Sequence, residues 1–466
     1  MYAIIVLLIY AVLMITATII LQKKKNTANK DDFHTAGHNV GGIISALSIA
    51  STWIWAPSLF TAAEKAYTSG VPGLFWFLVP NALCLILFIP FAKKIRKELP
   101  NGITLSGYMK QKYKSEKVKK VYMFQLGSLS VLSTAVQLLA GSKIISYISG
   151  VPFWIVTVIL SVIAFSYSQI SGIRASISTD VIQMLIILAC CALIVPWLIS
   201  NNGGIQFIGK GISGITGEFS SLFDEKGLEV LFAFGLPTTI GLISGPFGDQ
   251  SFWQRAFSVK QKSIGKSFLA GALIFSLVPL SMGIIGYLAA GCGFIANDSG
   301  MVNFELISKT LPAWVLIPFL FMIISGLLST VDSNLCSAAS LTTDRNVIET
   351  DTQNIKTSKI TMVFLLLVAI VIANIPGLTV THLFLFYGTL RASTLLPTVL
   401  TLKGKKLSAR GVFIGIITSL CVGLPIFAYG QICNVAIYKT IGSLVTVLLS
   451  GIIASLLAKF EVKQKC

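Results

Sequence analysis

Thirteen apolar stretches, each long enough to cross a lipid bilayer, fill most of this 466-residue chain. A transmembrane helix needs about 20 apolar residues, because the hydrocarbon core is about 30 Å thick. The chain is 54% hydrophobic and 12% charged, whereas soluble proteins carry roughly 25% charged residues. A spanning backbone must satisfy its own hydrogen bonds, which favours helices. The pattern therefore predicts an all-α polytopic membrane protein with about 13 transmembrane helices.

We number the predicted helices 0 to 12. The first span is too long for a cleavable signal peptide and lacks a basic start, so we expect it to remain in the protein. The predicted ranges are 2–22, 43–65, 71–92, 121–148, 152–169, 175–199, 228–250, 267–290, 313–340, 360–375, 379–402, 411–429 and 437–458.

Two of these stretches are broken by Gly and Pro. The stretch 43–67 is interrupted near Pro57, and the stretch 228–252 is interrupted by Gly241, by Gly245 with the proline that follows it, and by Gly248. Broken spans at corresponding positions of two halves indicate a transporter built from inverted repeats, with its binding site at the breaks.

The net charge of +18 follows the predicted topology. Of the 36 Lys and Arg residues, 29 lie in loops on one side of the predicted spans and five on the other. By the positive-inside rule this distribution places the N-terminus outside and the C-terminus in the cytoplasm of a plasma membrane, with a bacterial inner membrane favoured. The basic excess is thereby explained by topology, and we expect no nucleic-acid partner.

Polar residues inside the spans form the candidate ion site. Predicted helix 8 carries Ser329, Thr330, Asp332 and Ser333 in an apolar context, and predicted helix 5 carries Asp180. Ser329, Asp332 and Ser333 share a face at helical spacing, and their oxygens suit a small hard cation. The alternatives are that the hydroxyls only join helices by hydrogen bonds, and that Asp180 forms a salt bridge with Lys143 or Arg174.

Arg391 lies well inside predicted helix 10. An ionisable residue at such a depth needs a partner or a cavity. Three interpretations stay open for it: pairing with a carboxylate of the protein, reaching to the interface, and contact with the substrate.

Four motifs stand out along the chain: 245–258, with its Gln-x-x-x-Gln-Arg element, 104–113, 172–183 and 326–333. Together they resemble the sodium:solute symporter family over essentially the whole chain, with the urea symporters as the branch closest in motif. The resemblance implies the leucine-transporter fold: a single domain 1–466 with helix 0 at 2–22, one five-helix repeat at 43–199, an inverted one at 228–402, and extra helices at 411–458.

The resemblance also implies ligands. The main Na⁺ site would use backbone carbonyls of Ser51, Ile54 and Gly326 and the hydroxyls of Ser329 and Thr330. A second cation site would use Asp180, Asp332 and Ser333. Asp332 stands where some members have Ser, and two nearby carboxylates that share a proton would leave H⁺ coupling open.

The candidate substrate residues lie at the two breaks and in predicted helix 10. They are Trp53, Trp55, Phe247, Gln250 and Arg391. Residues 51–56 and 249–254 resemble the corresponding segments of urea symporters, which favours import of a small polar solute such as urea. Arg391 departs from that pattern, so the alternative is a symporter for a small carboxylate or amino acid.

A membrane sensor or receptor module is the alternative from another class. Only about eight residues follow the last predicted span, so we expect no output domain. Only three His residues are present, two of them in the first loop, and we therefore expect no enzyme. The sequence leaves the oligomeric state open.

Overall fold

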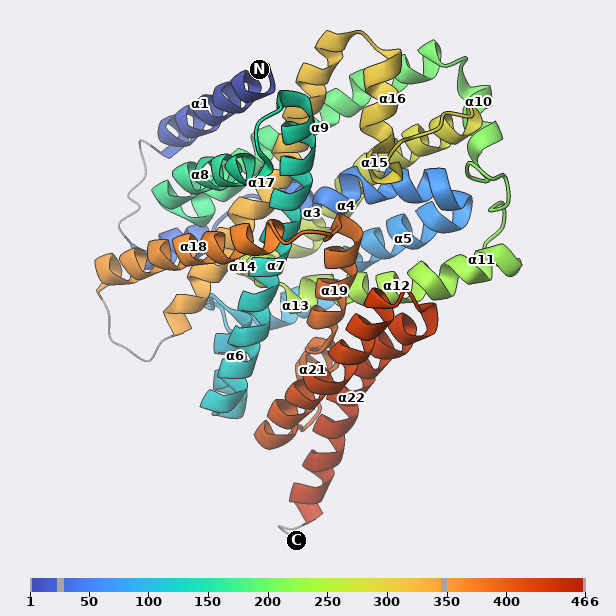
Figure 1. Cartoon of the computed structure of the whole chain (residues 1–466). Coiled ribbons are helices and arrows are strands. Elements are labelled where there is room, and N and C mark those ends of the chain that lie inside the picture. The colour runs from blue at the N-terminus through green and yellow to red at the C-terminus, as the bar shows by residue number, and fades with distance from the viewer. Residues whose placement is uncertain (1, 23–28, 345–349, 464–466) are drawn as a thin grey trace.

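The computed structural model describes residues 2–22, 29–344 and 350–463, and within these ranges it is helical (Figure 1). Parts of two basic loops, including Lys23, Lys24, Lys25 and Arg345, lie outside the described residues. Twelve helical segments of the described chain are long and apolar enough to cross a membrane. The predicted all-α membrane architecture is confirmed. In the view of Figure 1 the N-terminus lies at the top and the C-terminus at the bottom.

Ten of the twelve spans are formed by one long helix each. These helices are α1 (Tyr2–Gln22), α5 (Thr61–Glu98), α7 (Glu116–Ser149), α8 (Phe153–Ser171), α9 (Ile173–Asn201), α15 (Ile264–Gly291), α17 (Leu316–Ser340), α18 (Asp351–Ala373), α21 (Ala409–Ile432) and α22 (Ala436–Lys463).

The span predicted at 43–65 is the one missing from the twelve, because it is broken into short helices. Helix α3 (Gly42–Trp53) ends where Ile54 and Trp55 become extended, and α4 (Ala56–Leu59) then begins with Pro57 in its first turn. Proline suits this position because it has no N–H to leave unpaired. A second change of direction inside α5, at Ser69 and Gly70, separates the end of this broken span from predicted helix 2.

The second predicted break is also present. Helix α11 (Glu225–Val230), a π-helical turn (Leu231–Gly235) and α12 (Leu236–Ile243) lead into the four-residue α13 (Gly245–Gly248). Asp249 is extended and caps α14 (Gln250–Ser258) through its side chain. Pro246 lies in the first turn of α13 and has no backbone N–H to bond the preceding turn, which explains why α12 does not continue.

Predicted helix 10 is interrupted as well, at the turn that precedes Pro397, whose ring excludes a hydrogen bond to the carbonyl of Ser393. It consists of α19 (Val380–Ala392) and α20 (Leu395–Leu402). Ser393 and Thr394 bond three residues back rather than four, a tighter turn than the α-helix. Arg391 therefore lies in the last turn of α19 and not in the middle of a continuous span.

Short helices outside the predicted spans complete the chain. They are α2 (Lys30–Thr35), α6 (Leu105–Tyr113), α10 (Ile205–Gly211) and α16 (Val302–Thr310). Helices α21 and α22 pack on each other along their lengths in the lower part of Figure 1.

The segment before α3 is fastened to α14 and α18. Val40 and Val259 form a parallel β-bridge, and the carbonyl of His34 accepts a hydrogen bond from Gln254 Nε2 at 2.8 Å. The buried His34 ring places Nε2 3.0 Å from Oδ1 of Asn354 on α18. These contacts hold the segment before α3 against α14 and α18.

Burial lowers the pKa of His34 to about 4, from an ordinary value of 6.5. The unfolded chain therefore binds a proton between pH 6.5 and about 4 that the folded protein excludes. The free energy of unfolding is therefore unaffected by His34 above pH 6.5. It falls as the pH falls through this window, by at most about 1.4 kcal/mol per pH unit. We expect His34→Gln to show a flatter decline than the wild type when unfolding is measured by denaturant titration in detergent at pH 4.5 to 7. Parallel curves would contradict this role.

Candidate functional site

The break after α3 faces the polar turn of α17. The Thr330 hydroxyl lies 3.2 Å from the carbonyl oxygen of Thr52, 3.1 Å from that of Ile54 and 3.3 Å from that of Gly326. A hydroxyl has one proton and can donate to only one of these three acceptors. The surplus of converging oxygens is the arrangement that a small hard cation stabilises.

Ser329 lies next to this group but is engaged elsewhere. Its hydroxyl donates to Asp180 Oδ1 at 2.6 Å and accepts from the hydroxyl of Ser51 at 2.8 Å. The Ser51 carbonyl accepts from the amide of Ile54. Of the predicted main-site carbonyls, those of Ile54 and Gly326 lie at Thr330, and the carbonyl of Thr52 takes the place expected for that of Ser51. Ser329 joins this group to the carboxylate of α9.

Asp180 pairs with Arg255, so the alternative pairing with Lys143 or Arg174 was wrong. Arg255 Nη2 lies 2.8 Å from Asp180 Oδ2, and both side chains are almost completely buried. Lys143 instead bonds Asp298, and Arg174 bonds Asp32. Arg255 is the arginine of the Gln-x-x-x-Gln-Arg element, and α14 directs it back into the bundle.

Asp332 lies in the same buried cluster. Its Oδ1 accepts from Ser176 at 2.7 Å and from Ser333 at 3.2 Å, and Ser333 in turn accepts from Arg255 at 2.7 Å. The cluster holds two carboxylates and one guanidinium, so it carries one negative charge in excess when both acids are ionised. Either a cation or a proton would neutralise it.

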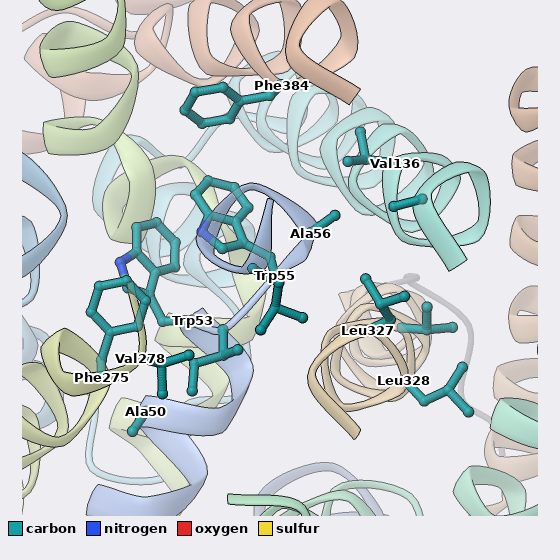
Figure 2. Close-up of a cluster of buried hydrophobic side chains, with 14 of the residues drawn as sticks. Ala50, Trp53, Trp55, Ala56, Val136, Phe275, Val278, Leu327, Leu328 and Phe384 are labelled. Atoms are coloured by element: carbon teal, nitrogen blue, oxygen red, sulfur yellow. The ribbon is translucent and has the colours of Figure 1, made fainter. Parts of the chain in front are cut away.

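The aromatic residues of the first break pack against each other. Trp53 and Trp55 stack with ring centroids 4.8 Å apart, and Phe384 of α19 meets Trp55 edge-on at 5.3 Å. Figure 2 shows the two indoles side by side, with Phe384 beyond Trp55 and Phe275 beside Trp53. The first break is thus lined by rings on one side and by oxygens on the other.

Arg391 connects the two broken spans. Its Nε donates to the carbonyl of Gly241 at 2.6 Å. Its guanidinium carbon lies 5.4, 5.1 and 5.3 Å from the ring centroids of Trp53, Trp55 and Tyr387. These distances are those of cation–π contacts.

The other two predicted substrate residues lie in different surroundings. The ring of Phe247 packs with Phe88, Phe91 and Trp253. The amide of Gln250 accepts from the backbone of Leu105 and donates to Ile103 and to Ser340. Phe247 is thus part of an aromatic core, and Gln250 joins α14 to the loop before α6 and to α17.

Several site residues are absent from the sequence-based set. Ser48 and Ser176 bond the two carboxylates, and Gln137 accepts the amide of Ala56 at the break. Arg255 had a signal, because it belongs to a recognised motif. Ser176 also lies in a recognised motif, 172–183. Ser48 and Gln137 had no such signal, since isolated polar residues in apolar helices are common.

A cavity of about 760 Å³ is lined by Phe60 and Thr61, which follow the first break, but not by Trp53, Trp55 or Arg391. Its lining includes charged residues of both signs, among them Glu64, Lys65, Lys143, Asp298 and Lys439. Leu385 of α19, one residue from Phe384, also lines it. Bonds of Gln250 and of the segment around His34 close the opposite end of the molecule.

A polar core at two helix breaks is typical of secondary transporters of the broken-helix type. The family model of the sodium:solute symporter family matches residues 33–419. The chain belongs to this family, as the motifs predicted.

Curated relatives and solved structures agree with this membership. The chain is 22% identical to the urea-proton symporter DUR3 of Oryza sativa subsp. japonica over 85% of its length. It is 22% identical to the sodium/pantothenate symporter of Haemophilus influenzae, covering 94% of both chains. A Na⁺-coupled sialic acid symporter in a substrate-bound, outward-open state matches with a TM-score of 0.78, at 18% identity and 98% coverage of both chains.

The match to the urea transporters is partial in length. The chain spans 60% of the rice protein and 44% of probable urea active transporter 1 of Schizosaccharomyces pombe. The relatives and the structural neighbours are transporters, which agrees with the expectation that the chain is not an enzyme.

Proposed function

We propose that this protein is a secondary active symporter that couples the uptake of a small polar solute to Na⁺. The observation that carries the proposal is the convergence of three backbone carbonyls on the Thr330 hydroxyl at the first break. Neutral oxygens of this kind hold Na⁺ without burying a full counter-charge. The Na⁺ coupling named for the pantothenate and sialic acid relatives supports the same ion.

The second cation position is proposed at Asp180, Asp332 and Ser333. One excess negative charge there attracts Na⁺, but a proton shared by the carboxylates would also satisfy it. Proton coupling is therefore the alternative, and the name of the rice relative favours it. Within the described ranges, no three His, Cys, Asp or Glu side chains gather as a metal site.

Transport would follow alternating access between the two proposed repeats, 43–199 and 228–402. The cavity beside Leu385 would admit solute from outside, and the contacts of His34 and Gln250 would have to break for release inside. This assignment uses the topology that the loop charges predict, with the N-terminus outside and the C-terminus in the cytoplasm. Urea-like solutes and small carboxylates are the two substrate classes that the motifs leave open.

Proteoliposome uptake tests the coupling. We expect an inward Na⁺ gradient to drive solute accumulation above equilibrium at constant pH, and replacement of Na⁺ by choline to abolish it. Accumulation driven by a pH gradient alone, with no response to Na⁺, would replace Na⁺ by H⁺. Equilibration without accumulation under either gradient would contradict symport.

A further inference from the structure

We propose that Arg391 recognises an anionic group of the substrate, and that the solute is a small carboxylate rather than urea. The inference rests on the proposed transport function and assigns the substrate class of the same site. It follows from the burial of Arg391, from its unused donors and from its position between the two breaks.

Arg391 is 1% exposed. A guanidinium stays charged at every physiological pH, and a buried charge needs a counter-charge or a full set of hydrogen bonds. None of the ion pairs among the described residues includes Arg391. The acid of the second break, Asp249, directs its Oδ1 to the amide and hydroxyl of Ser251 instead.

The donors of Arg391 are only partly used. Nε is bonded to Gly241, whereas Nη2 is buried and has no partner. The three aromatic rings around the guanidinium stabilise its charge but offer no lone pairs in the plane of its N–H groups. That plane is where a carboxylate binds an arginine with two parallel hydrogen bonds.

Two neighbours of Arg391 also have unused donors. Trp55 Nε1 and the Tyr387 hydroxyl are buried without partners, and both rings contact the guanidinium. Three residues in mutual contact therefore each carry a buried donor group without a partner. A carboxylate has only acceptors and matches such a set, whereas urea carries four N–H bonds that require acceptors.

The position of Arg391 places it where a solute is expected to bind. A methyl group added to Gly245 would meet the Trp53 ring and would lie 3.4 Å from the guanidinium carbon, and one added to Gly248 would lie 2.6 Å from Arg391 Cβ. The glycines of the second break thus allow α19 and the first break to approach each other. Arg391 lies at the point where these three elements meet.

The experiment measures uptake of matched acids and amides by the full-length protein in proteoliposomes. The pairs are acetate with acetamide, propionate with propionamide and lactate with lactamide, and urea is added as a fourth neutral solute. We expect at least one acid to be taken up at least tenfold better than its amide and than urea. Arg391→Lys should retain the preference for the acid at lower affinity, and Arg391→Gln should abolish it.

Arg410→Gln is the matched control, because it removes the same charge from an exposed position at the start of α21. It should leave the acid preference unchanged. A wild type that prefers an amide or urea, or takes up none of the acids, would overturn the inference. If Arg391→Gln fails to fold, anion recognition is still tested by the acid preference of the wild type and by its retention at lower affinity in Arg391→Lys. Thermal stabilisation by Na⁺ relative to choline is recorded in parallel, so that failure of Na⁺ coupling is distinguished from failure of anion recognition.

Discussion

Replacing Arg255 with Met is expected to destabilise the protein by about 3–5 kcal/mol, because it leaves Asp180 charged and unpaired in the bundle. The substitution also removes the hydrogen bonds that Arg255 donates to Ser48 and Ser333. Uptake should therefore be abolished. The measurement is the free energy of unfolding by denaturant titration in detergent, together with uptake by the reconstituted variant.

The double variant Arg255→Met with Asp180→Asn removes both charges and should recover most of the lost stability. Arg174→Gln is the control, since its ion pair with Asp32 is partly exposed and should cost less than about 1 kcal/mol. A double variant as unstable as Arg255→Met would show that the guanidinium stabilises the cluster by some means other than pairing with Asp180. Recovery of stability without transport would separate the structural role of the pair from its role in coupling.

Thr330→Val is expected to raise the Na⁺ concentration for half-maximal uptake by about tenfold or more. The change keeps the shape of the side chain and removes the hydroxyl that contacts the carbonyls of Thr52, Ile54 and Gly326. Losing one ligand oxygen of a buried site costs about 1–3 kcal/mol, and 1.4 kcal/mol corresponds to a tenfold change. The affinity for the solute at saturating Na⁺ should change much less.

Thr361→Val is the matched control. Thr361 lies on α18 and bonds only the carbonyl of Thr357 four residues earlier, so its Na⁺ dependence should equal that of the wild type. Equal Na⁺ dependence in Thr330→Val would place the coupling ion elsewhere, with the Asp180 and Asp332 cluster as the remaining position.

The fold could be predicted from sequence wherever the signal is local. Apolar length gives the spans, and Pro57 and Gly245 with its neighbouring proline mark the two breaks. The interruption of predicted helix 10 at residues 393–394 was not predicted, although Pro397, four residues after Ser393, marks it in the same way. The first break also explains why twelve and not thirteen helical segments of the described chain are long enough to cross a membrane. Helix α3, the part before this break, is too short by itself.

The site was less accessible to sequence reasoning because its contacts join distant segments. Asp180 and Arg255 are 75 residues apart, and helical spacing relates neither to the other. Lys143 and Arg174 were nearer in the sequence, but each bonds a carboxylate outside the predicted spans, Asp298 and Asp32 respectively. Gln250 was assigned by resemblance, and its amide joins Ile103, Leu105 and Ser340. Its substrate role stays a prediction.

Equilibrium binding of ²²Na⁺ to the purified protein tests the central claim most directly, because it requires no knowledge of the solute. We expect saturable binding by the wild type and by Thr361→Val at constant pH, and binding weakened by about tenfold or more in Thr330→Val. Absence of saturable ²²Na⁺ binding by the wild type, or binding of equal affinity in Thr330→Val, would contradict the account.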